Sequence, residues 1–148
     1  MEFMSDDREL GIKLAKRFKL SKTALMIQDY SKCYHHIFEQ ALKECESLEK
    51  VVHIVIVSGS ERFLYNALCG LKNLTEFQRQ DLVLALVKTK DATCIYLTLC
   101  NCLELNRKHK NLLVKGLVET KNCMYACSAL HQVFGLTKAQ KKVLASVR

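Results

Sequence analysis

Apolar residues recur along this chain at the three- to four-residue spacing of an amphipathic helix, and the whole pattern repeats along the chain. Leu82-Val83 with Leu86-Val87 comes back as Leu113-Val114 with Leu117-Val118. This spacing defines a period of about 31 residues, and a fixed period of that order is typical of stacked structural units, each of which buries its apolar face against its neighbour. The pattern therefore predicts an all-α protein built from similar helical units.

Within one period the pattern predicts a helix, a tight turn and a second helix. We expect a first helix over 6–27, helix pairs over 30–42 with 46–58, 61–71 with 75–88 and 92–103 with 106–119, a helix near 123–134 and a last helix from 137. The 148 residues include no proline, which would interrupt such helices. The predicted fold is a small right-handed α-solenoid of about four antiparallel helix pairs, in which residues 1–148 form a single domain. Residues 1–3 are either native or a remnant of cloning in front of a native start at Met4.

Residues that favour the N-cap of a helix share one position of the period. They are Asp29, Ser60, Asp91 and Asn122. A second position holds Tyr34, Tyr65 and Tyr96, and the fourth unit has Cys127 there with Tyr125 two residues earlier. A tyrosine at a repeated position most often packs between units with its hydroxyl group at the rim. Stacking of these rings on a base or a peptide is the alternative.

The segment Thr-Lys-Asp-Ala-Thr-Cys-Ile-Tyr at 89–96 joins two of the expected helices. It is similar to the turn of short α-helical tandem repeats found in bacterial and phage proteins, which has the form T-[KG]-[DN]-A-x-x-[IL]-Y. More broadly, the chain resembles HEAT-like solenoids over about 45–135, with a degenerate copy before that stretch. The resemblance implies an architecture and carries no common catalytic activity with it.

The net charge of +8 is unevenly distributed. Residues 1–60 contain nine Lys or Arg and nine Asp or Glu, whereas residues 61–148 contain fourteen and six. Arg79, Lys110 and Lys141 share one position of the period, and stacked helices lie about 8–10 Å apart, so we expect these cations to form a row along one edge. Such a row can follow a phosphate backbone. The candidate nucleic-acid-binding residues are Arg79, Arg107, Lys108, Lys110, Lys115, Lys141 and Lys142. An ordinary solvated helix face is the more common explanation, and both stay open.

Eight cysteines raise the question of a metal centre. Cys123-x₃-Cys127 fits the spacing of a zinc knuckle loosely, whereas Cys100 and Cys102 point to different sides of a helix. Cysteine is also a small and commonly buried apolar residue. Because Cys69 and Cys100 share a position of the period, we expect them to pack in the core, and we expect no metal and no cofactor.

Histidines give little indication of catalysis. A thiol nucleophile needs a base beside it, and only Cys33 has histidines close in sequence, at His35 and His36. Neighbouring residues face different sides of a helix, so surface histidines beside a buried cysteine explain this cluster better. His53 lies inside an apolar run, which favours a place in the core or at a subunit contact. We expect no catalytic residue.

These patterns favour a non-enzymatic protein-interaction module, such as an effector or an inhibitor of a larger complex. Nucleic-acid backbone binding through the basic row is the alternative. No motif of nucleotide-binding loops or hydrolases is present in the sequence. No stretch approaches the roughly 20 apolar residues of a membrane helix, and the first residues are polar, so we expect a cytoplasmic protein, either in the cell that makes it or in a host. The oligomeric state stays open.

Overall fold

The computed structural model describes residues 38–39, 41–43 and 46–147. The helix expected over 6–27, Asp29, Tyr34 and the Cys33–His36 cluster lie outside these residues. Every element of regular secondary structure within them is a helix, which confirms the all-α class. The helices are α3 (Leu48–Ser58), α4 (Glu61–Gly70), α5 (Glu76–Thr89), α6 (Ala92–Asn101), α7 (Arg107–Glu119), α8 (Cys123–Gln132) and α9 (Lys138–Ala145). They begin and end close to the positions that the apolar pattern predicts.

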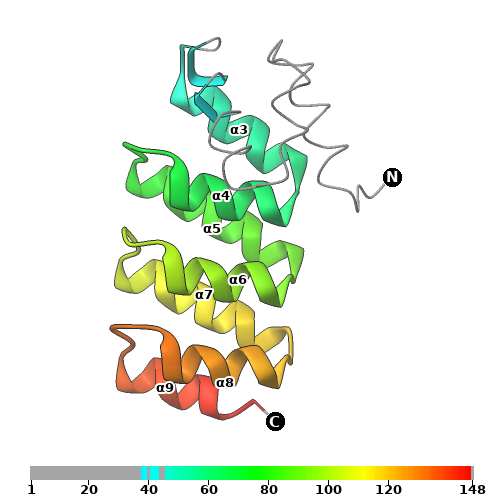
Figure 1. Ribbon diagram of the computed structural model, residues 1–148, viewed down its shortest axis with the longest axis vertical. Coiled ribbons are helices and arrows are strands. Elements are labelled where there is room, and N and C mark those ends of the chain that lie inside the picture. The colour runs from blue at the N-terminus through cyan, green and yellow to red at the C-terminus, as the bar shows by residue number, and fades with distance from the viewer. Residues whose placement is uncertain (1–37, 40, 44–45, 148) are drawn as a thin grey trace.

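The described helices form two layers (Figure 1). In the layer nearer the viewer α4 packs on α6 and α6 on α8, and in the layer behind it α3, α5, α7 and α9 pack on one another in that order. Each helix also contacts the next helix along the chain, so the two layers are joined at every level. The helices stack from the N-terminal end of the described chain to its C-terminal end.

Polar side chains cap the N-terminus of each described helix. In the nearer layer the side chains of Ser60, Asp91 and Asn122 accept a hydrogen bond from the backbone N–H three residues on, as the period predicts. A second set caps α5, α7 and α9, and its members are also one period apart: Thr75, Asn106 and Thr137. Each of these forms a capping box, because a side chain three residues later accepts the N–H of the cap residue. These boxes fix the direction in which the preceding loops enter the helices.

The turns between α3 and α4, α5 and α6, and α7 and α8 use the left-handed backbone conformation. Gly59, Lys90 and Lys121, again one period apart, have φ angles of 65°, 59° and 59°. Glycine adopts this conformation freely, whereas a residue with a Cβ atom loses about 1 kcal/mol. The two lysines therefore carry a small strain that the glycine avoids.

The core runs between the layers. The largest fully buried side chains are Phe63, Leu64, Leu82, Leu86, Ile95, Leu113, Leu117, Leu144, His109, Val51 and Val83. Gly116 lies at the closest approach of α7 to α5, because a Cβ atom at this position would be 2.8 Å from each Cγ atom of Val87. The absence of a side chain at Gly116 therefore allows α7 and α5 to pack closely.

The tyrosines pack between successive helices of the nearer layer, with their hydroxyl groups at the rim. The Oη of Tyr65 accepts a hydrogen bond from Asn101 Nδ2 at 2.9 Å, and the Oη of Tyr96 donates one to Gln132 Oε1 at 2.9 Å. The displaced Tyr125 still contacts Tyr96, with ring centroids 5.2 Å apart. These interactions agree with the packing role and join neighbouring helices of this layer.

Two predicted core positions are not in the core. His53 is exposed on α3, so of its two predicted places the core is wrong, and the subunit contact stays a prediction. Cys69 is exposed, so it does not lie in the core, whereas Cys100 is half-buried and packs against the core.

Candidate interaction surface

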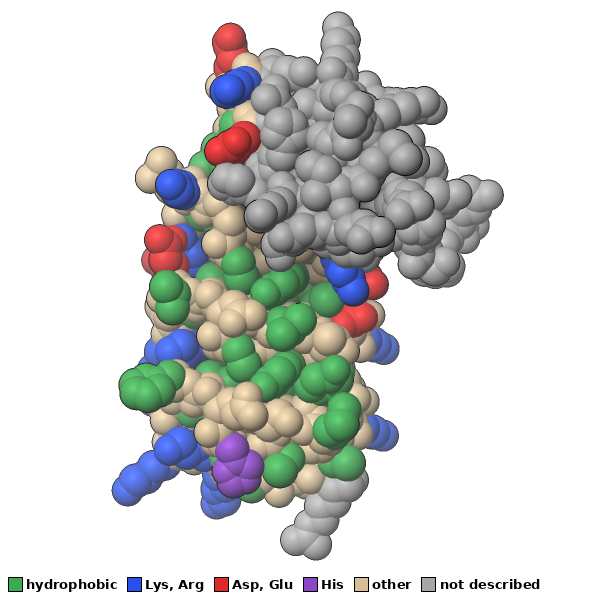
Figure 2. All heavy atoms as spheres, in the orientation of Figure 1, with side chains coloured by type: hydrophobic (Ala, Val, Ile, Leu, Met, Phe, Trp, Pro, Cys, Tyr) green, Lys and Arg blue, Asp and Glu red, His purple; other side chains and the backbone are tan. Residues whose placement is uncertain are grey.

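One edge of the molecule combines exposed apolar side chains with cations. It consists of the loops that lead into α5, α7 and α9 and the first two turns of these helices, and we call it the loop edge. In Figure 2, Lys and Arg side chains lie along this edge at the left of the view, with acidic side chains among them in the upper part and exposed hydrophobic side chains between them in the lower part. The nearer face between the two edges carries few charges, since no Asp, Glu, Lys or Arg occurs in 92–103 or 123–136.

The capping boxes hold the loop edge in place. Asn106 Oδ1 accepts the N–H of His109 at 2.8 Å, and His109 Nδ1 accepts the N–H of Asn106 at 3.3 Å. The same exchange joins Thr137 and Gln140 at the start of α9. Because these side chains satisfy N–H groups at the helix N-termini, the termini offer fewer donors to a bound anion.

Two loop residues project into solvent at equivalent places. Leu103 is 95% exposed and Phe134 is 93% exposed, and each lies two residues beyond the end of a helix of the nearer layer. The apolar pattern predicts both residues at the ends of helices, over 92–103 and 123–134, and does not predict that they lie on the surface. The available signal was their separation by one period, because two large apolar residues at one loop position are not explained by a core. We call Leu103 and Phe134 the apolar tips.

Arg79 does not contribute to an exposed row of cations. Its side chain is only 12% exposed, and its Nη2 donates to Glu104 Oε2 at 2.6 Å and to the carbonyl oxygen of Leu74 at 3.4 Å. The guanidinium charge is therefore neutralised within the protein. The expected row begins at Lys110 instead, because the residue facing Arg79 happens to be acidic.

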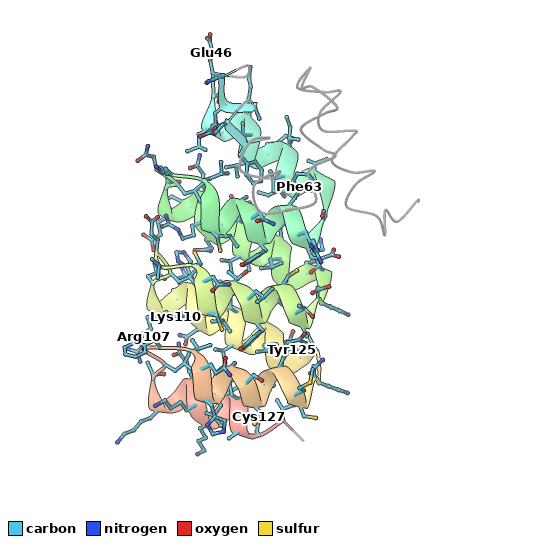
Figure 3. The ribbon with its side chains drawn as sticks, viewed as in Figure 1. Glu46, Phe63, Arg107, Lys110, Tyr125 and Cys127 are labelled. Atoms are coloured by element: carbon cyan, nitrogen blue, oxygen red, sulfur yellow. The ribbon has the colours of Figure 1, made fainter. Side chains whose placement is uncertain are left out.

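Lys110 occupies the position of Arg79 in the next unit but lacks the carboxylate. The residue one period after Glu104 is Gly135, and a Cβ atom there would lie 3.3 Å from Lys110 Nζ. No Asp or Glu follows Glu119 in the sequence, so no acidic side chain of α8, α9 or their loops can neutralise Lys110. Figure 3 shows Lys110 and Arg107 together at the loop edge. Lys110 is half-buried as a residue, and its ammonium group has no ion pair among the described residues.

The remaining predicted cations surround this position. Arg107 and Lys108 lie in the first turn of α7, and Lys141 and Lys142 lie on α9; all four are exposed. Lys115 is also exposed and lies seven residues after Lys108, which places it on the same face of α7, two turns from the loop edge. The structure therefore brings all the candidates together except Arg79, which is paired, and Lys115, which is more distant.

His109 and Gln140, next to the cations in sequence, point inward. Gln140 is buried and its Nε2 donates to Asn111 Oδ1 at 2.6 Å. His109 is fully buried, and its Nε2 has no hydrogen-bond partner among the described residues. Burial lowers the pKa of His109, and the positive charge of Arg79 lowers it further. These two side chains serve the fold and are not available to a ligand.

Neither a metal centre nor a membrane segment is found in the part of the chain that the structure describes. No three His, Cys, Asp or Glu side chains there are placed to hold a metal ion, and Cys123 and Cys127 are exposed on α8. No helix among these residues combines the length and the hydrophobicity that crossing a bilayer requires.

No family model matches the chain, and neither a curated protein nor a solved structure is significantly similar to it. The resemblance to bacterial and phage tandem repeats therefore stays a prediction.

Proposed function

We propose that this chain is a non-enzymatic protein-binding module built from tandem helical repeats, and that it binds an acidic partner protein through the loop edge. The observation that carries the proposal is the pair of apolar tips, Leu103 and Phe134, which stand almost fully in solvent among cations. Large apolar side chains in the centre of an interface provide much of the binding free energy, while charged rims steer the encounter. The tips suit the first role and the lysines suit the second.

The charge of the loop edge defines the chemistry of the partner. From Leu103 onward the edge contains one acidic residue, Glu104, and this residue is already paired with Arg79. Lys110 then presents an unpaired ammonium group beside Gly135. A carboxylate of the partner would take, at Lys110, the place that Glu104 takes at Arg79. The partner surface is therefore acidic, with apolar pockets for the tips. An effector or an inhibitor that acts on a larger complex is a protein of this kind.

Nucleic-acid backbone binding is the second candidate, and Lys110 with Lys141 favours it. Both lysines lie at one position of the period, and neither forms an ion pair among the described residues. Three observations make this candidate weaker. Arg79 is withdrawn from the row, the capping boxes satisfy the helix N-termini, and Leu103 has no use on a phosphate backbone.

Affinity capture with tip variants tests the proposal. The full chain and its Leu103→Asp/Phe134→Asp variant would be used as bait in lysate treated with nuclease, and bound proteins would be quantified by mass spectrometry. Val57→Asp is the matched control, because Val57 is an exposed apolar residue in the last turn of α3, at the opposite edge. We expect an acidic protein to bind the wild type and the control but not the tip variant. Equal capture by all three baits would contradict the proposal.

A polarisation titration with fluorescent DNA and RNA tests the second candidate. Phosphate binding predicts an affinity that falls steeply between about 50 and 200 mM salt. Charge reversal at Lys110 and Lys141 would flatten that slope, whereas reversal at Lys88, an exposed cation in the last turn of α5, would leave it unchanged. No measurable binding at the lower salt concentration would exclude this candidate.

A further inference from the structure

Two cysteines from different helices meet behind the loop that carries Leu103. Cys69 lies in the last turn of α4, and Cys102 is the C-cap residue of α6. The Sγ–H of the buried Cys102 donates to the carbonyl oxygen of Leu68 at 3.3 Å, and Leu68 directly precedes Cys69. Each of the two thiols also perturbs the pKa of the other. The Cys102 sulfur therefore lies against the last turn of α4, at the residue next to Cys69.

Only one level of the described stack has this pair of thiols. At the equivalent positions one period earlier stand Phe38 and Leu71, and one period later stand Cys100 and Val133. Cys102 and Val133 are buried to the same extent, so the site needs only a small apolar side chain for packing. The packing of the core therefore does not explain why this level of the stack has two thiols.

The two thiols differ in exposure and in acidity. Cys69 is exposed on the surface of α4, so a small oxidant has access to the pair. The hydrogen bond from Cys69 lowers the pKa of the Cys102 thiol, and the Glu104 N–H and the Arg79 guanidinium act in the same direction. The same hydrogen bond, together with burial, raises the pKa of Cys69. A lowered pKa favours the thiolate form of Cys102, which is the form that attacks a peroxide, and Cys69 lies beside it at the surface.

We propose that Cys69 and Cys102 form a reversible disulfide that links α4 to the loop after α6. With hydrogen peroxide as the oxidant, the Cys102 thiolate attacks one peroxide oxygen and the O–O bond breaks. The other oxygen leaves as hydroxide and takes up the proton released by the Cys102 thiol to become water, and Cys102 becomes a sulfenic acid. The Cys69 sulfur then attacks the Cys102 sulfur and forms the S–S bond. Hydroxide leaves from Cys102 and takes the Cys69 proton to become water. A dithiol reductant returns both thiols.

The disulfide would act on the loop edge through the chain itself. Cys102 directly precedes Leu103, and Glu104, which pairs with Arg79, follows at the next position. Oxidation would replace the hydrogen bond from Cys102 to Leu68 with a covalent link and hold this loop to α4. The inference about the disulfide does not depend on the function proposed above, because it concerns only the two sulfur atoms.

Thiol mapping of the full chain tests this inference. The reduced protein would be treated with one equivalent of hydrogen peroxide, alkylated under denaturing conditions and digested without reduction. We expect a peptide that links Cys69 to Cys102, a loss of two of the eight titratable thiols, and recovery of both with dithiothreitol. Cys102→Val, which copies Val133, should keep the fold and abolish the link, and Cys69→Ser should do the same. Cys123→Ser, at another exposed cysteine of a nearer-layer helix, should leave the link unchanged.

Two results would overturn the inference. One is peroxide treatment that oxidises Cys123 or Cys127 while Cys69 and Cys102 stay reduced. The other is a link between Cys69 and Cys102 that forms no faster than links between other cysteine pairs. Circular dichroism of each variant shows whether it folds, and the wild-type map decides the question even if one variant does not.

Discussion

Replacing His109 with glutamine tests how the capping boxes and the core are coupled. His109 is 0% exposed at the third position of α7, and its Nδ1 accepts the N–H of the cap residue Asn106. The opposite ring atom, Nε2, then carries a proton and has no partner among the described residues. Glutamine occupies this position at Gln78 and Gln140, the equivalent residues of α5 and α9.

The expected gain comes from the unpaired donor. A buried polar group without a hydrogen bond costs about 1–3 kcal/mol. Gln140 avoids this cost, because its Oε1 accepts the N–H of Thr137 while its Nε2 donates to Asn111 Oδ1. A glutamine at 109 would keep the capping bond to Asn106, and Gln80, which stands one period before Asn111, would offer it the same acceptor. We therefore expect His109→Gln to raise the free energy of unfolding by about 1 kcal/mol at neutral pH, which corresponds to about 2–4 °C in Tm for a chain of this size.

Acidification should increase the difference between the two proteins. Burial, with a further contribution from Arg79, lowers the pKa of His109 in the folded state, and Glu76 opposes this only in part. In the unfolded chain the pKa returns to about 6.5. Above that pH neither state holds the extra proton, and the stability of the wild type is complete. Below it the unfolded chain takes up a proton that the folded chain resists, so stability falls by at most about 1.4 kcal/mol per pH unit.

Urea unfolding followed by circular dichroism measures this effect. The wild type and His109→Gln would be compared at about pH 7.5 and about pH 5.5, on either side of the unfolded-state pKa. The variant should be more stable at both, with the larger difference at the lower pH. His131→Gln, at an exposed histidine of α8, should change neither value. A variant no more stable than the wild type, or a difference that stays constant with pH, would refute the assignment of His109 as a neutral, unsatisfied group.

Three further substitutions test local features of the fold by thermal or urea unfolding. Asp91→Ala removes the N-cap of α6 and should cost about 0.5–2 kcal/mol; a loss no larger than that of an exposed loop alanine would count against the cap. Lys90→Gly should stabilise by about 0.5–1 kcal/mol, because Gly59 holds the same left-handed conformation without strain; a destabilised variant would contradict this. Gly116→Ala should destabilise by about 1–3 kcal/mol through its clash with Val87, and Val87→Ala should restore part of the loss. Equal effects of Gly116→Ala in both backgrounds would show that the contact is not responsible.

The helices and their boundaries could be predicted because local chemistry determines them. Asp91 caps α6 through a hydrogen bond to a residue only three positions away, and its neighbours Ser60 and Asn122 do the same for α4 and α8. Apolar spacing along a helix is equally local. The second set of caps was equally visible in the sequence, since Thr75 and Thr137 precede glutamines by three residues, which is the pattern of a capping box.

The environment of a side chain could not be predicted in the same way, because it depends on contacts between distant residues. Arg79 and Lys110 are equivalent in the sequence, yet Arg79 forms an ion pair with Glu104 and Lys110 faces Gly135. The partner of Arg79 lies 25 residues away, in a loop whose path is set by the packing of α6 on α4. Residues one period apart are predicted to lie at equivalent places along the stack. Whether such a residue forms an ion pair depends on the residues of the neighbouring units that contact it. The sequence predicts that Leu103 is helical because its apolar side chain continues the helical spacing. The helix itself ends two residues earlier, at Asn101.

Departures from the period are therefore better guides to function than the period itself. Where one unit has a chemically unreactive residue, that residue shows what the packing of the fold requires at this position of the period. Val133 shows that the site of Cys102 needs only a small apolar group, so its thiol is free to have a chemical role. Glu104 shows that a carboxylate fits beside the cation of its unit, so the absence of one at Gly135 leaves Lys110 able to bind an external carboxylate. In each case the residue at the equivalent position of the neighbouring unit is the substitution that a test variant should carry.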